Sequence, residues 1–228
     1  ENASFMPWLV ATALLHSLAV TEQRGAFRAW TALLALIGFA LSLLGTFLVR
    51  SGVLVSVHAF ATDPERGYFI LAFLSLVVGC ALLLFALRGH VLRDSASFEP
   101  YSRETLLLVN NVLLVVTSAS VLLGTLFPIA ADFLQIGKYS VGPPYFDRVF
   151  VALTSALLVL IGMAPVTRWK RDTLRRRARP YLLWLALSAL LTALWLQGIR
   201  VPGGGVLDEP MLIAGIGFAS WILIASLG

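Results

Sequence analysis

The chain has 228 residues, of which 59% are hydrophobic and only 13% are charged, with a net charge of +5. Its mean hydropathy is +0.88. A water-soluble domain of this length cannot bury that much apolar surface, so lipid is the expected solvent for most of the chain. The single cysteine, Cys80, lies in an apolar run, which excludes a disulfide framework, a CxxC redox site and a cysteine zinc site.

The apolar residues form seven runs of roughly the length that a helix needs to cross a bilayer. Leu, Ala and Val dominate these runs without the period-2 alternation of barrel strands. The sequence therefore predicts an all-α integral membrane protein, a polytopic helical bundle of about seven transmembrane helices. The predicted spans are Phe5–Val20, Trp30–Val49, Tyr68–Leu87, Leu106–Phe127, Val149–Val166, Tyr181–Gly198 and Met211–Leu227.

Residues 1–228 are expected to form one transmembrane helical domain. The chain begins with ENASF, without an initiator Met or a signal peptide, and stops inside an apolar run. We expect both ends to be cuts through a longer protein.

The basic residues indicate the orientation of the spans. The loops after the first, third and fifth spans hold twelve Lys and Arg, whereas the alternate loops hold five. Basic loops stay in the cytoplasm, so the segment TRWKRDTLRRRARP is expected there. A lipid-binding role for this segment is the alternative. The N-terminus and the loop at residues 50–67 are then expected on the outer face.

Two local patterns mark boundaries near this outer loop. Asp63 is suited to cap the third span, with Pro64 at its first helical position. Apolar residues at helical spacing between Gly52 and Ala61 predict a short helix in the outer interface. In a later loop, Pro143 and Pro144 are expected to stiffen the approach to the fifth span.

Two histidines stand out against this apolar background. His16 lies inside the first span, and His58 lies in the short outer loop. An intramembrane histidine is costly without a partner and is a functional candidate by default. Neutral imidazole is also a standard axial ligand of haem iron. The pair suggests a protein that handles haem in and beside a bilayer.

His16 and His58 are not expected to share one iron. At about 1.5 Å of rise per residue, their depths differ by about 20 Å, whereas two axial nitrogens lie roughly 4 Å apart. The third histidine, His90, is expected on the cytoplasmic side. Two interpretations remain: His16 bonds a neighbouring helix and His58 is a surface residue, or each is half of an axial pair completed from outside this chain.

Other polar residues complete the candidate list. Arg50 and Arg66 flank the outer loop and are suited to pair with haem propionates, the alternative being interfacial charges that snorkel. Asn110 and Asn111 lie inside the fourth span, where hydrogen bonding between helices is the preferred role over a substrate contact. The hydroxyl cluster of the same span is interpreted in the same way; it comprises Thr117, Ser118 and Ser120.

Five segments together resemble the CcmF family of cytochrome c maturation proteins. They are ENASFMPWL, LLHSLAVTEQRG, GTFLVRSGVLVSVHAFATDPERG, NNVLLVV…LLGTLFPI and VGPPYF, in the family's order, over residues 1 to about 150. Residues 151–228 resemble the family only in hydropathy pattern. Glu1–Ser4 match the tail of the family's tryptophan-rich (WWD) segment.

The resemblance implies specific roles. His16 matches an intramembrane histidine that binds a resident b-type haem, and His58 matches an external histidine that binds the haem being attached. Both would be axial ligands of haem iron, and His58 would be the catalytic residue, by holding the haem in position. Arg50 is added to the cofactor-binding set. The second ligand of each pair lies outside this chain.

The implied activity is that of a haem lyase, in a complex in the bacterial inner membrane, with its active site on the periplasmic side. It would attach delivered haem to the CxxCH thiols of an apocytochrome c, forming thioethers. The implied partners are a CcmE-like holo haem chaperone, apocytochrome c, a CcmH-like protein that presents the apoprotein thiols, and membrane lipid, but not nucleic acid. The alternatives are a haem or solute transporter and a non-catalytic assembly scaffold without bound haem. A Soret spectrum of the purified protein would distinguish the scaffold from the other two.

Overall fold

The computed structural model describes residues 1–51, 64–93, 96–198 and 210–227, and these contain α-helices and one short 3₁₀-helix but no strand. All seven α-helices are long and apolar enough to cross a membrane. The predicted all-α class is confirmed. The α-helices are α1 (Asn2–Arg24), α2 (Arg28–Arg50), α3 (Pro64–Arg88), α4 (Arg103–Phe133), α5 (Pro143–Met163), α6 (Leu174–Gly198) and α7 (Pro210–Leu227), with the 3₁₀-helix η1 (Gly89–Leu92) after α3.

Most of the helices extend beyond the predicted apolar runs, because charged residues continue a helix past the hydrocarbon. The fourth run, for example, lies within a helix of 31 residues. Pro64 begins α3, as predicted. Pro143 begins α5 itself, so the prolines occupy the first turn rather than the approach to it, where the missing N–H costs no hydrogen bond. Asp63 and the predicted helix at 52–61 lie outside the described residues.

The chain divides into two compact units. Unit 1 comprises residues 1–96 and 108–153, and unit 2 comprises residues 97–107 and 154–228. Both α4 and α5 contribute to each unit, so the division runs through helices rather than through a linker. The single-domain organisation stays a prediction.

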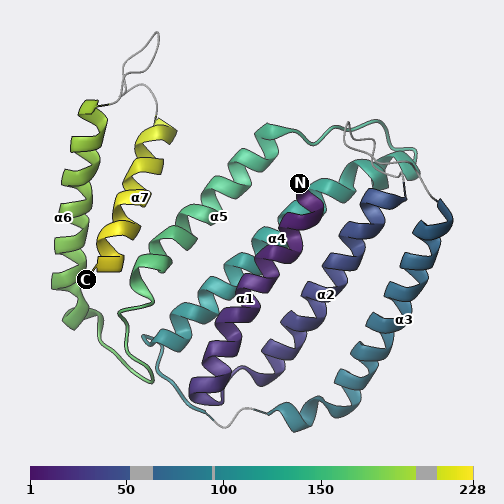
Figure 1. Ribbon diagram of the computed structural model, residues 1–228, viewed down its shortest axis with the longest axis horizontal. Coiled ribbons are helices and arrows are strands. Elements are labelled where there is room, and N and C mark those ends of the chain that lie inside the picture. The colour runs from purple at the N-terminus through teal and green to yellow at the C-terminus, as the bar shows by residue number, and fades with distance from the viewer. Residues whose placement is uncertain (52–63, 94–95, 199–209, 228) are drawn as a thin grey trace. The chain divides into compact units, whose positions relative to one another are not determined.

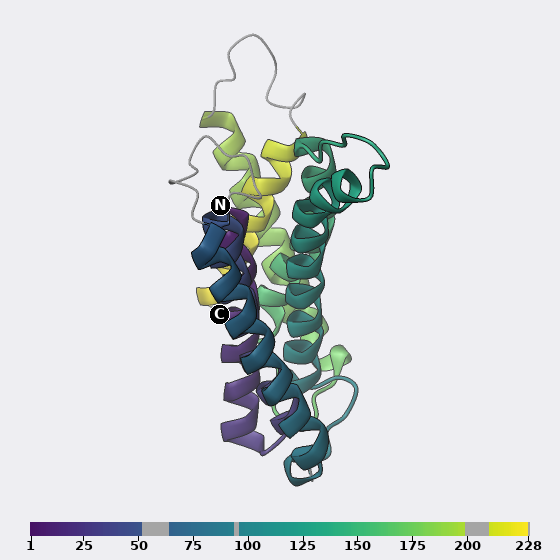
Figure 2. The same cartoon turned by 90° about the vertical axis from the view of Figure 1, so that its right-hand side faces the viewer.

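In unit 1, α1 and α2 form a tight antiparallel hairpin (Figure 1). Gly25 ends α1 with φ 66°, a left-handed conformation that favours glycine, and its N–H donates to the carbonyl of Thr21. At the other end of the hairpin, a Cβ on Gly45 would overlap the carbonyl oxygen of Ala3. Glycine therefore allows the two helix backbones to touch. The part of α4 in this unit lies in a separate layer beside α1 to α3 (Figure 2).

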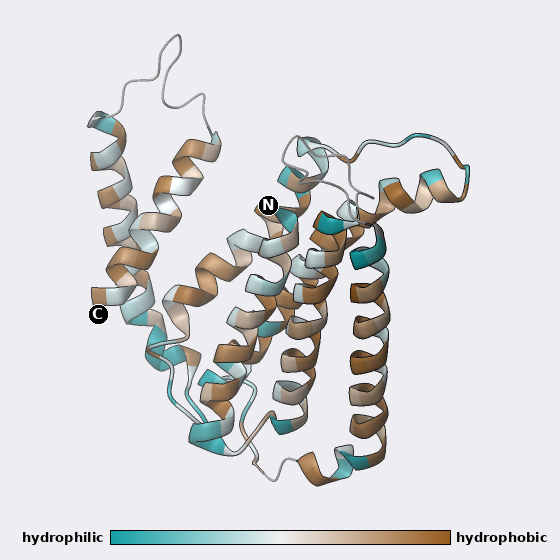
Figure 3. Cartoon of the chain, turned by 45° about the vertical axis from the view of Figure 1, so that its right-hand side comes forward, coloured by the Kyte–Doolittle hydropathy of each residue, from teal (hydrophilic) through white to brown (hydrophobic). Residues whose placement is uncertain are grey.

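The surface of α3 is exposed almost throughout. Large side chains such as Tyr68, Phe69 and Leu76 are 66–73% exposed. Apart from its charged ends the helix is hydrophobic over its visible length (Figure 3). Such a surface is suited to lipid or to further apolar helices.

In unit 2, α6 and α7 pack through aromatic residues. Trp184 lies between Tyr181 and Trp221, with ring centroids 5.7 Å and 6.4 Å away. The indole N–H of Trp221 donates to the carbonyl of Val159 at 3.3 Å. A Cβ on Gly162 would overlap that indole nitrogen, so a glycine on α5 makes room for the ring.

Candidate functional site

A series of uncharged polar contacts joins α1 to α4 in unit 1. The Asn2 side-chain amide donates to the Thr125 hydroxyl at 3.0 Å, and the Ser118 hydroxyl donates to the carbonyl of Met6 at 3.1 Å. Farther along the two antiparallel helices, His16 Nδ1 lies 3.1 Å from Asn110 Nδ2. These contacts fix the register of α1 on α4.

The imidazole of His16 is partly exposed, while the asparagines that it meets are buried. Asn110 is 6% exposed and supplies the hydrogen bond; the adjacent Asn111 is fully buried and also interacts with the imidazole. Among the described residues, the Asn110 carbonyl oxygen Oδ1 is buried without a hydrogen-bond partner. An uncommitted acceptor thus lies next to the ring.

Hydroxyl groups hold the part of α1 that carries His16. The Ser17 and Thr31 hydroxyls lie 2.7 Å apart, and Thr31 lies 2.9 Å from the Thr21 hydroxyl. Thr21 also donates to the carbonyls of Ser17 and Ala26. Because these bonds link α1 to α2 one residue away from His16, the backbone at the histidine is well fixed.

The surroundings of His16 fit the ligand role that its sequence suggests. A metal-ligating histidine donates its second ring N–H to an acceptor, and Asn110 Oδ1 is an acceptor of the required kind. Neighbouring residues leave apolar side chains exposed, namely Leu15 and Leu18 on α1, and Val109 and Val112 on α4. A partly exposed imidazole among apolar helix surfaces suits a haem with an axial histidine. Within the described ranges, no three His, Cys, Asp or Glu side chains converge on a possible metal-ion position.

The other predicted site residues lie elsewhere or outside the described residues. Arg50 is the last residue of α2 and is exposed. His58 lies outside the described residues, so its proximity to Arg50 stays a prediction. Ala3 faces Gly45 near the Arg50 end of the hairpin. Thirteen residues of helix at about 1.5 Å each place His16 about 20 Å from Ala3.

His90 lies in η1, beyond the far end of α3. At the near end of α3, a Cβ on Gly67 would lie 3.2 Å from Ser51 Cβ, next to Arg50. The length of α3, 25 residues, therefore separates His90 from the Arg50 end of unit 1. His90 therefore lies at the opposite end from Arg50 and Gly67, the described flanks of the outer loop.

The interhelical role predicted for the polar residues of α4 is confirmed for Asn110 and Ser118. It is wrong for two members of the hydroxyl cluster. Thr117 donates to Leu113 and Ser120 donates to Val116, each to a carbonyl one turn earlier in its own helix. A hydroxyl in a helix satisfies itself in this way without a partner helix.

Unit 2 contains a cluster of charged residues that sequence reasoning missed. Glu104, in the first turn of α4, is fully buried, and both of its carboxylate oxygens accept the Lys170 backbone N–H at 3.0 Å. The Arg103 guanidinium lies 5.0 Å from the Trp169 ring centroid and donates to the carbonyls of Thr167 and Pro165. The acidic residue at a helix N-terminus was the available signal.

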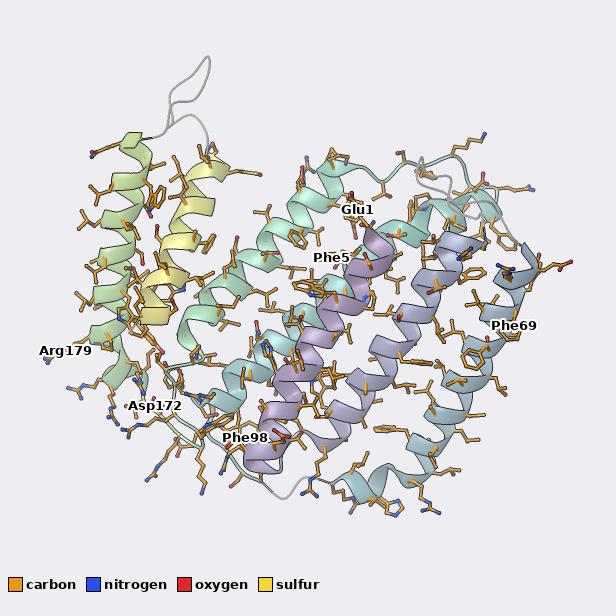
Figure 4. The ribbon with its side chains drawn as sticks, in the orientation of Figure 1. Glu1, Phe5, Phe69, Phe98, Asp172 and Arg179 are labelled. Carbon is orange, nitrogen blue, oxygen red and sulfur yellow. The ribbon has the colours of Figure 1, made fainter. Side chains whose placement is uncertain are left out.

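Asp172 organises the segment that leads into α6. Its carboxylate accepts a hydrogen bond from the Arg177 guanidinium at 2.8 Å. It also accepts hydrogen bonds from the backbone N–H groups of Thr173 and Arg168. Burial alone would raise the pKa of Asp172, but these hydrogen bonds outweigh it and lower the pKa to about 2. Basic side chains, including the labelled Arg179, surround this end of the unit (Figure 4). The polybasic segment is therefore ordered, as a turn that continues into the first turns of α6.

Comparison with known proteins agrees with the resemblance and extends it. The family model described as "Cytochrome C assembly protein" matches residues 1–56. The "Cytochrome c-type biogenesis protein CcmF" of Escherichia coli (strain K12) is 52% identical over 230 residues, covering all of this chain and 34% of that protein. The CcmF of Pseudomonas aeruginosa is 59% identical over 193 residues, covering 85% of this chain and 29% of that protein.

A solved structure titled "Cytochrome c Heme Lyase CcmF" has a similar fold, with a TM-score of 0.70 and 30% identity. The match covers 99% of this chain and 31% of that chain. The likeness thus includes residues 151–228, for which the sequence suggested only a shared hydropathy pattern. The chain spans about a third of the length of the curated relatives it matches.

Proposed function

Because this chain belongs, along the whole of its own length, to the CcmF family of cytochrome c-type biogenesis proteins, we propose that it takes part in cytochrome c maturation as part of a haem lyase. The observation that carries the proposal within the molecule is the partly exposed His16, hydrogen-bonded by a buried asparagine inside a predicted membrane span. Bacterial relatives support a multi-pass protein of the inner membrane.

His16 is proposed as one axial ligand of a resident b-type haem, whose iron supplies electron-transfer chemistry when bound. This chain contributes the imidazole, the hydroxyl contacts that fix its backbone, and exposed apolar side chains on α1 and α4. The second axial ligand comes from outside this chain. The role of His16 is positioning and electrostatic, as is usual for a protein that binds a redox cofactor.

His58 is proposed as a ligand of the haem that is to be attached, on the periplasmic side, with Arg50 pairing with a propionate. In this arrangement His58 holds the substrate haem so that its vinyl groups face the CxxCH thiols of apocytochrome c. Each cysteine thiol adds across one vinyl group: a sulfur–carbon bond forms and the thiol hydrogen passes to the other vinyl carbon. The step is redox-neutral, so orientation is the main contribution of the protein.

The proposed partners follow from this reaction. A CcmE-like chaperone delivers haem, and a CcmH-like protein presents the reduced thiols of apocytochrome c.

The outer location of His58 rests on the bias of basic residues. Single cysteines placed at residues 167–179, in a Cys80→Ser background, should be shielded from an external membrane-impermeant reagent, whereas cysteines at 51–57 should react. The reverse pattern would overturn the orientation.

The test of the proposed function is the absorption spectrum of the purified full-length protein. A resident haem with two axial ligands gives a six-coordinate, low-spin Soret spectrum. A preparation that inserts into membranes but lacks any Soret band, as purified and after incubation with haem and removal of the unbound haem, would leave the protein as an assembly scaffold.

A further inference from the structure

The amide of Asn110 can serve the imidazole of His16 in two ways. As placed, Asn110 Nδ2 faces His16 Nδ1 at 3.1 Å, and Asn110 Oδ1 is buried without a hydrogen-bond partner among the described residues. The two ends of a carboxamide have nearly the same size and shape, so a half-turn of the amide exchanges them. The exchange would place the uncommitted oxygen against the ring.

Each orientation corresponds to one tautomer of the imidazole. When the amide N–H faces Nδ1, the ring accepts at Nδ1 and carries its proton on Nε2. When the amide oxygen faces Nδ1, the ring donates from Nδ1, and Nε2 keeps a lone pair. Only the second tautomer can bind a metal through Nε2. Bound histidines typically hold this form through a hydrogen bond from the other nitrogen to an acceptor.

We propose that Asn110 is a positioning residue for the haem site: its Oδ1 accepts the Nδ1–H of His16, sets the ligating tautomer and strengthens the imidazole as an electron donor. The inference rests on the proposed role of His16. It adds that the ligand strength is tuned from α4, a helix that the sequence does not link to His16.

The burial of Asn110 supports this role. At 6% exposure, the amide is shielded from water, and the bilayer gives no competing hydrogen bonds. The register of α1 on α4 is held independently by the contact of Ser118 with Met6, more than two turns farther along α4. The register of the two helices therefore does not depend on Asn110 alone, and its side chain can serve the imidazole of His16.

The experiment compares Asn110→Leu and Asn110→Asp in the full-length protein, with the resident haem assayed by haem content per polypeptide and by midpoint potential. Asn110→Leu removes the acceptor at similar volume. We expect haem affinity to fall about 10–100-fold, as for other outer-shell ligand partners, and the potential of the haem that remains to rise. Asn110→Asp offers a stronger acceptor, so the potential should fall below that of the unchanged protein.

Ser118→Ala is the matched control, because it removes another polar contact between the same two helices. It should leave both the haem affinity and the potential unchanged. Shifts of the same sign in the Leu and Asp variants, or equal shifts in Ser118→Ala, would mean that Asn110 acts only through packing and would overturn the inference. If Asn110→Leu fails to insert, Asn110→Asp still tests the inference: a lower midpoint potential supports it, and an unchanged or higher potential overturns it.

Two further outcomes separate this inference from the proposed function. If His16→Ala abolishes haem binding but Asn110→Leu changes neither affinity nor potential, the inference fails and the haem site stands. An effect of Asn111→Leu with none from Asn110→Leu would also overturn it, because the neighbouring amide would then be the partner. Retention of haem by His16→Ala would overturn the proposed haem site itself, and the inference with it.

Discussion

Unit 1 joins α1 to α4 through uncharged side chains, most of them within the predicted spans, whereas unit 2 joins the first turn of α4 to the segment before α6 through charged side chains. In unit 1 the contacts come from amides, hydroxyls and one imidazole, such as the contact of His16 with Asn110. In unit 2 the carboxylates of Glu104 and Asp172 accept backbone N–H groups. Charge is therefore used where a helix begins, and neutral polarity where lipid surrounds the helices.

The difference follows from the cost of burying each kind of group. An ionised side chain in the hydrocarbon costs several kcal/mol, whereas a neutral amide or hydroxyl with a partner costs far less. At a helix N-terminus the backbone N–H groups already need acceptors, so a buried carboxylate is stabilised there. Each of the following predictions tests one side of this comparison.

The largest effect is expected from His16→Ala. Removal of the imidazole should abolish or strongly loosen the resident haem while the protein still inserts, because the register of α1 depends on other contacts. Haem content and the Soret spectrum of the purified protein measure the loss. Full haem occupancy in this variant would show that the polar contacts of unit 1 are purely structural.

His58→Gly should reduce cytochrome c maturation in cells steeply, and added free imidazole should restore part of it by filling the gap at the iron of the delivered haem. The haem at His16 should stay in place. His90→Gly is the control and should alter neither readout, because His90 lies beyond the far end of α3. Normal maturation in His58→Gly would mean that the outer histidine is misassigned.

Gly45→Ala tests the close approach of α1 and α2. The added Cβ would overlap the carbonyl oxygen of Ala3, a backbone atom that cannot turn away. We expect a loss of about 1–3 kcal/mol, typical of overpacking, seen as a lower melting temperature in detergent. Gly79→Ala is the control, since nothing lies within 4 Å of its added Cβ. Equal melting temperatures for the two variants would contradict the tight packing.

The smallest effect is expected from Asp172→Asn in unit 2. The pKa of Asp172 is about 2 in the folded protein against 3.8 ordinarily, so the folded state is favoured by ionisation. That stabilisation is complete above about pH 4 and is lost as the pH falls through about 2. Asp172→Asn should lower the melting temperature by a few degrees at pH 7, and this difference should shrink as the pH falls below 4. A difference that stays constant with pH would argue against the ion pair with Arg177.

The sequence by itself determined the class of the protein and the number of its spans. Lipid offers the backbone no hydrogen bonds, which leaves helices and closed barrels, and runs of Leu, Ala and Val at bilayer length without period-2 alternation favour helices. It also singled out His16 as a candidate ligand, since an imidazole inside an apolar span is costly without a partner. Pro64 was located as a helix start because proline is favoured at the first helical position, where its missing N–H costs no hydrogen bond.

Only the tertiary structure decided which polar groups meet. Asn110 was predicted to bond another helix, but its pairing with His16 depends on the register of α1 on α4, which hydropathy does not encode. Thr117 was predicted to do the same and instead bonds its own helix, since both outcomes satisfy the hydroxyl equally well. The burial of Glu104 likewise depends on a segment more than sixty residues away. Apolar periodicity places a residue in a span, whereas the partner is set by the packing of whole helices.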